Sequence, residues 1–158
     1  MNSETMKAYL ARNIDLARKT QPLEGKMETY WFENPSVGLT RTLFHRIAVP
    51  LKPFDSGLEW ELQPIDASFV FDWYALGVVN PREIHGLNLC HRNYPDSEAS
   101  IYIGNAHNPC DVLRLTVAAL SSEVVELGCT VEIIFEHEMV ARNELFEFTA
   151  TARWHVVQ

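Results

Sequence analysis

The densest group of chemically reactive side chains lies between His107 and Asp111. The segment reads His-Asn-Pro-Cys-Asp, so an imidazole, a thiol and a carboxylate fall within one short stretch. These groups are the usual protein ligands of zinc and related ions. Because Asn-Pro is a strong turn former, we expect a connecting loop here, and loops on a rigid scaffold often carry sites. The candidate metal ligands are residues of this loop and two upstream histidines: His85, His91, His107, Cys110 and Asp111.

The spacing of these residues matches no established zinc or catalytic motif. The sequence has no C-x-x-C pair, no H-E-x-x-H, no phosphate-binding glycine loop and no nucleophile elbow. A Cys110 thiolate activated by His107 or His91 would need a spatial proximity that the spacing does not indicate. We therefore assign no catalytic residue and no cofactor. A metal site or a small enzyme using the His107–Asp111 loop is kept as an alternative.

A second group of distinctive side chains is acidic and lies near the C-terminus. Its members are the candidate partner-binding residues Glu132, Glu136, Glu138, Glu144 and Glu147. In the hairpin predicted below, Glu132 lies opposite Arg153, whereas Glu138 lies opposite Glu147. Directly opposed like charges destabilise a sheet. A surface for a basic partner would explain them, and solvated carboxylates at an exposed hairpin end would need no partner.

The last third of the sequence predicts the strands that carry these glutamates. From Cys129 to Phe135 the apolar side chains occupy odd positions, and from Phe146 to Val156 they occupy even positions. Alternation with period two is typical of strands with one buried face. A turn centred on Arg142-Asn143 aligns the two apolar faces and places Val131 opposite Trp154.

Shorter alternating runs recur from residue 28 to residue 157, separated by Pro, Gly, Asn and Asp. They predict a mainly β fold, an antiparallel β-sandwich or barrel of about seven to nine strands. Ahead of them, the three- and four-residue spacing of Met6, Leu10, Ile14 and Ala17 predicts one α-helix over residues 3–20, packed outside the sheet. The length of the chain favours a single domain over residues 1–158.

The charge of the chain is unevenly distributed. The net charge is −8; residues 1–50 carry +2, whereas residues 51–100 and 101–158 carry −5 each. This negative field disfavours nucleic acids and anionic membrane surfaces as partners. An odd count of three cysteines favours free thiols, and the charged N-terminus differs from a secretion signal, so we expect a cytoplasmic protein.

These features lead to two functional hypotheses of different classes. The first is a non-catalytic cytosolic binding protein that uses an acidic β surface to engage a basic protein partner, for example an inhibitor or immunity-type protein. The alternative is a β-barrel that binds a small apolar ligand among its many aromatic side chains. The sequence does not indicate the oligomeric state.

Overall fold

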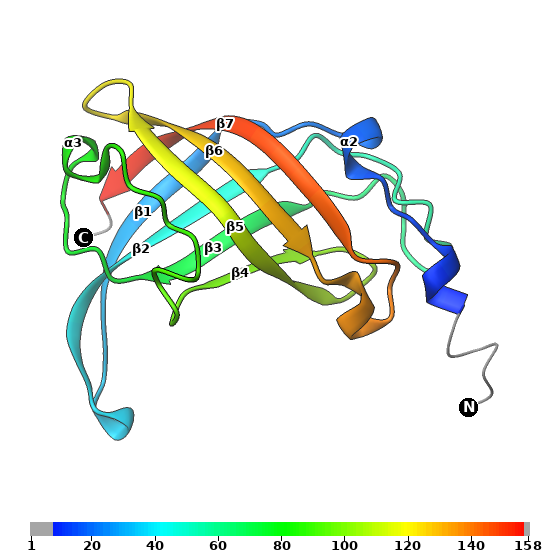
Figure 1. Cartoon of the computed structure of the whole chain (residues 1–158), viewed down its shortest axis with the longest axis horizontal. Helices are drawn as coiled ribbons and strands as arrows, with labels where there is room; N and C mark the ends of the chain where they lie inside the picture. Colours follow the sequence, from blue (N-terminus) through cyan, green and yellow to red (C-terminus); the bar gives the residue numbers. More distant parts are fainter. Residues whose placement is uncertain (1–7, 157–158) are drawn as a thin grey trace.

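The computed structural model describes residues 8–156, which form a closed barrel of seven strands (Figure 1). Each strand pairs with its neighbours in sequence, and β1 closes the barrel against β7. Consecutive strands run antiparallel, so with an odd number of strands the closing pair β1–β7 is parallel. The mainly β prediction is confirmed. The strands are β1 Gly25–Asn34, β2 Leu39–Pro50, β3 Ser68–Tyr74, β4 Glu98–Tyr102, β5 His107–Ala119, β6 Val124–Ile133 and β7 Glu144–Val156.

The predicted inward face of the C-terminal hairpin is confirmed. Every second residue of β6 and β7 is buried, and Val131 and Trp154 both belong to the core. The predicted pairing register is wrong, however: Val131 lies opposite Phe146, and Arg153 lies opposite Val124. The observed register differs from the predicted one by an even number of residues, so each side chain still lies on the predicted face of the sheet.

The register differs because β6 ends earlier than the alternation predicts. After Ile133 the chain forms the 3-10 helix η3, Phe135–Glu138. Phe135, Val140 and Ala141 are buried there and plug this end of the barrel. A wide apolar connection therefore replaces the tight turn expected at Arg142-Asn143.

The prediction of one continuous helix over residues 3–20 is wrong for residues 8–20. Residues 3–7 lie outside the part of the chain that the structure describes. A 3-10 turn, η1 (Ala8–Ala11), and one turn of α-helix, α2 (Leu16–Lys19), are separated by Asp15 in the left-handed region at φ 62°. The Glu144 carboxylate accepts hydrogen bonds from the backbone N–H groups of Asp15 and Leu16, each at 2.7 Å. Contacts with the barrel thus replace helical hydrogen bonds, and the segment buries both Ile14 and Leu16.

Two connections shape the outside of the barrel. The β1–β2 hairpin extends as an arm beyond the barrel wall, with the 3-10 helix η2 (Pro35–Val37) at its tip (Figure 1). The short helix α3 (Pro81–Ile84) lies in the long connection from β3 to β4. This connection continues through residues 85–97 to the start of β4.

Candidate functional site: an acidic, hollowed face of the barrel

The His107–Asp111 segment is not a loop but the first part of β5. Its side chains alternate, so His107, Pro109 and Asp111 are exposed while Asn108 and Cys110 are buried. The Asn108 amide nitrogen donates to the backbone carbonyl of Ile103 at 2.9 Å, which ties the β4–β5 turn together. The expected loop is therefore a strand whose side chains alternate between exposed and buried positions.

The interior position of Cys110 makes it a poor nucleophile. The thiol is buried, and its sulfur lies 3.9 Å from the Asn108 carbonyl oxygen. Burial raises the pKa of Cys110 well above its ordinary value, because a thiolate would lose its hydration. The same effect raises the pKa of Cys129 to about 12, where the charge of Arg114 opposes it. Both thiols are protonated near neutral pH.

The candidate metal ligands are only partly brought together. His91, His107 and Cys110 line one open cavity of about 440 Å³, and Asp111 shares a neighbouring cavity of about 570 Å³ with His91. His85 instead accepts a hydrogen bond from the backbone N–H of Ala119, at 2.8 Å from its Nδ1. Within residues 8–156, no three His, Cys, Asp or Glu side chains are placed to hold one metal ion.

The first cavity contains acidic residues that the sequence did not place there. Glu98 enters it from the start of β4, and His137 and Glu138 enter it from η3. Partial burial lowers the pKa of His91, and the negative charges of Asp111 and Glu98 oppose that shift.

Four neighbouring cavities share lining residues between positions 91 and 98. Glu98 lines both the first cavity and another of about 640 Å³, at the base of the β1–β2 arm. Asp96 lines both the cavity at the base of the arm and a smaller cavity beside it. The smaller cavity shares Asn93 with the cavity that Asp111 lines. Arg92 is the one Lys or Arg residue among the described side chains that line these four cavities.

This negative surface continues onto β6. Asp111 of β5 lies directly opposite Glu132 of β6, a cross-strand pair of like charges. The sequence predicted such a pair at Glu138 and Glu147, which the true register separates. We call the set Asp96, Glu98, Asp111, Glu132 and Glu138 the acidic face.

The five carboxylates of the acidic face are free. Within the described part of the chain, none of them forms an ion pair or accepts a hydrogen bond from another residue. Many other carboxylates of the protein are engaged. Glu28 binds Arg46 at 2.7 Å, and the two oxygens of Glu61 accept from the Ser56 hydroxyl and the Gly104 backbone N–H.

Of the predicted partner-binding glutamates, some are free and the others form contacts within the fold. Glu132 and Glu138 belong to the acidic face. Glu144 holds the N-terminal segment, Glu136 accepts from the Asn143 backbone N–H at 3.2 Å, and Glu147 lies 3.8 Å from Arg114. Three of the five are thus bound within the fold.

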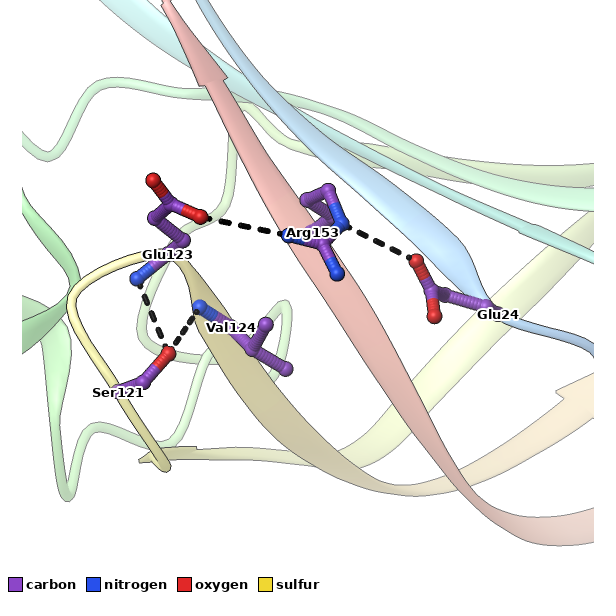
Figure 2. Close-up of polar contacts among 5 residues, drawn as sticks. All are labelled: Glu24, Ser121, Glu123, Val124 and Arg153. Carbon is purple, nitrogen blue, oxygen red and sulfur yellow. Dashed lines mark hydrogen bonds and ion pairs between the residues drawn. The ribbon is translucent and has the colours of Figure 1, made fainter.

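The predicted ion pair between Glu132 and Arg153 does not form. Arg153 lies between Glu24 and Glu123, with a distance of 3.4 Å to each carboxylate (Figure 2). The Ser121 hydroxyl accepts hydrogen bonds from the backbone N–H groups of Glu123 and Val124 and so orders the β5–β6 turn (Figure 2).

Several aromatic side chains fill the barrel interior. Phe69 stacks on both Phe146 and Phe148, with ring centroids 5.7 and 5.5 Å apart. Phe71 stacks on Phe69 with ring centroids 6.2 Å apart, and both Phe71 and Tyr74 are fully buried. Trp73 is different, because it faces outward and packs edge-on with Phe32 and Phe44 at the base of the arm.

Comparisons of the chain with protein-family models, with curated proteins and with solved structures found no match. Among the described residues, no helix has both the length and the apolar character that crossing a bilayer requires.

Proposed function

We propose that this chain is a non-catalytic binding protein that engages a basic protein partner through the acidic face. The observation that carries the proposal is the set of five carboxylates on or beside the cavities, none of which forms an ion pair within residues 8–156. The opposed pair Asp111 and Glu132 costs the isolated fold some stability, which a cationic partner would offset.

The shape of the surface supports a protein partner. The face is concave over several neighbouring cavities, so a partner can insert side chains as well as align charges. Acidic surfaces steer basic partners and raise association rates, as an inhibitor or immunity-type protein requires. The three free cysteines support a role in a reducing compartment such as the cytosol.

Calorimetric titration with end-blocked hexalysine at low ionic strength tests whether cations bind at this face. The test variant is the triple reversal Asp96→Lys, Glu98→Lys and Glu138→Lys. The matched control reverses three exposed acids elsewhere: Glu59→Lys, Asp66→Lys and Glu126→Lys. Both triples change the net charge equally, so any difference between them reports location.

We expect the face variant to lose at least about tenfold in affinity, equivalent to about 1.4 kcal/mol, and the control to lose much less. Added salt should weaken wild-type binding because exposed charges are screened. Equal losses in the two triples would show that hexalysine senses only the overall charge, and the acidic face would then have no special role.

A further inference from the structure

The cavity at the base of the arm combines aromatic and acidic groups in one place. It has a volume of about 640 Å³, and the side chains that define its chemistry are Phe44, Trp73, Asp96 and Glu98. Val37 and Leu39 of the arm line the same cavity. An aromatic wall beside carboxylates suits a cation that carries an apolar stem.

The protein already contains a filled site of the same composition. Arg46 lies over the Tyr30 ring, with its guanidinium carbon 5.3 Å from the ring centroid. The same guanidinium contacts Glu28 at 2.7 Å and Asp72 at 3.8 Å. One aromatic ring and two carboxylates thus hold one arginine. The arm cavity offers Trp73, Asp96 and Glu98 without an arginine.

Two other exposed tryptophans are covered by arginines of the chain itself. Arg41 lies 4.7 Å from the Trp31 ring centroid, and Arg12 lies 5.0 Å from that of Trp60. Within residues 8–156, no lysine or arginine covers Trp73. Trp73 is the partly exposed tryptophan that lacks an internal cation, and acidic side chains share its cavity.

The backbone fixes Trp73 firmly in this place. Its φ of 66° is in the left-handed region, an unusual conformation for a bulky residue. The Asp72 carboxylate accepts from the Trp73 N–H at 2.7 Å, and the Ser97 hydroxyl donates to the Trp73 carbonyl at 3.2 Å. The second bond also links Trp73 to the segment that carries Asp96 and Glu98. Strained residues held in this way are concentrated at ligand sites.

We infer that the arm cavity is a receptor for an arginine side chain of the basic partner, with the guanidinium against Trp73 and paired with Asp96 and Glu98. This inference rests on the proposed function and names the group that the partner inserts. A guanidinium is favoured over an ammonium because it is planar, less strongly hydrated and able to bind a carboxylate through two parallel hydrogen bonds.

The test compares end-blocked hexa-arginine with hexalysine, two peptides of equal charge, by calorimetry. Wild-type protein should bind hexa-arginine at least about threefold more tightly, the scale of a single exposed cation–π contact. Trp73→Leu should remove this preference, because it should weaken the binding of hexa-arginine more than that of hexalysine. The control Trp31→Leu removes an exposed tryptophan outside the cavity and should preserve the preference.

An NMR titration keeps the test decisive if Trp73→Leu does not fold. The indole N–H resonance of Trp73, assigned through Trp73→Phe, should shift on addition of hexa-arginine, and that of Trp154 should not. An unshifted Trp73 indole, or an arginine preference that persists in folded Trp73→Leu, would overturn the arginine receptor while leaving the acidic face intact. Failure of both peptides to bind would instead reject the proposed function.

Discussion

Acidic side chains on or beside β7 form contacts within the fold, whereas those around β4 to β6 remain unpaired within the described part of the chain. At the start of β7, Glu144 binds two backbone N–H groups of the N-terminal segment, and near its end Glu24 and Glu123 flank Arg153. Around β4 to β6, Asp111 and Glu132 face each other with no cation between them. Local sequence therefore does not decide whether a glutamate stabilises the fold or remains available to a partner; the strand register and the tertiary contacts of its position do.

Removal of the Glu144 carboxylate, which two backbone N–H groups bind, should have the largest effect on stability. Glu144→Ala should lower the free energy of unfolding by about 2–3 kcal/mol, since two backbone donors lose a charged acceptor. Urea denaturation measures this change. Glu126→Ala is the control, because Glu126 is exposed, and it should change stability by about 0.5 kcal/mol or less. Similar losses in both variants would contradict the role given to Glu144.

A buried histidine should make stability fall in mild acid. His45 lies in the barrel interior, with its Nε2 2.8 Å from the Val78 carbonyl oxygen and its Nδ1 3.4 Å from that of Tyr74. Burial lowers the pKa of His45, and the two carbonyls oppose that shift. The unfolded chain, with an ordinary histidine pKa of about 6.5, then takes up the proton first.

The stability contributed by neutral His45 is therefore complete above about pH 6.5 and is lost as the pH falls through the lower folded pKa. Unfolding midpoints in urea across this range should show the decline in wild type and a flatter profile in His45→Gln. The exposed His155→Gln is the control and should retain the wild-type profile. If the unfolding midpoint of His45→Gln fell with pH as steeply as that of wild type, another group would be responsible for the acid sensitivity.

Neutralising one member of the opposed pair Asp111 and Glu132 should have the opposite effect and stabilise the fold. Asp111→Asn should raise stability by a few tenths of a kcal/mol, on the order of a cross-strand like-charge repulsion. Glu123→Gln should lower stability by a similar amount, because it removes a partner of Arg153. Thermal unfolding at low ionic strength resolves the sign. Destabilisation by Asp111→Asn would show that this carboxylate supports the fold.

The smallest expected effect is on a histidine that senses the acidic face. Because the carboxylates of Asp111 and Glu98 raise the pKa of His91 against the lowering by burial, Asp111→Asn or Glu98→Gln should lower it further. NMR titration of the imidazole protons reports this pKa directly. Glu126→Gln should leave it unchanged, and an unchanged value in all three variants would mean that the face exerts no field at His91.

The sequence predicted the faces of the sheet better than the partners across it. Alternation identifies which side chains of β6 and β7 point inward, since this depends only on residue parity. The register depends on where β6 ends, and the burial of Phe135 and Val140 at the barrel end is a tertiary effect with no local signal. The misplaced ion pair of Arg153 follows from that one error.

The candidate site was predictable only in part, because residue type indicates chemistry but not position in space. The sequence marked His91, His107 and Asp111 as reactive, and they do lie on neighbouring cavities, but in a strand and not in a loop. Asp96 and Trp73 were missed as site residues, since nothing local distinguishes an outward tryptophan from a core one. The helix over residues 3–20 failed because Glu144, distant in sequence, captures the backbone at Asp15.

Cations should bind this protein where its carboxylates form no internal ion pair. Backbone amide NMR during a titration with end-blocked hexa-arginine tests it across the whole chain at once. We predict that the shifts concentrate at the acidic face, residues 96–98, 111, 132 and 138, and at Trp73. Shifts that instead centre on Glu24 and Glu123, or spread evenly over all exposed acids, would contradict the claim.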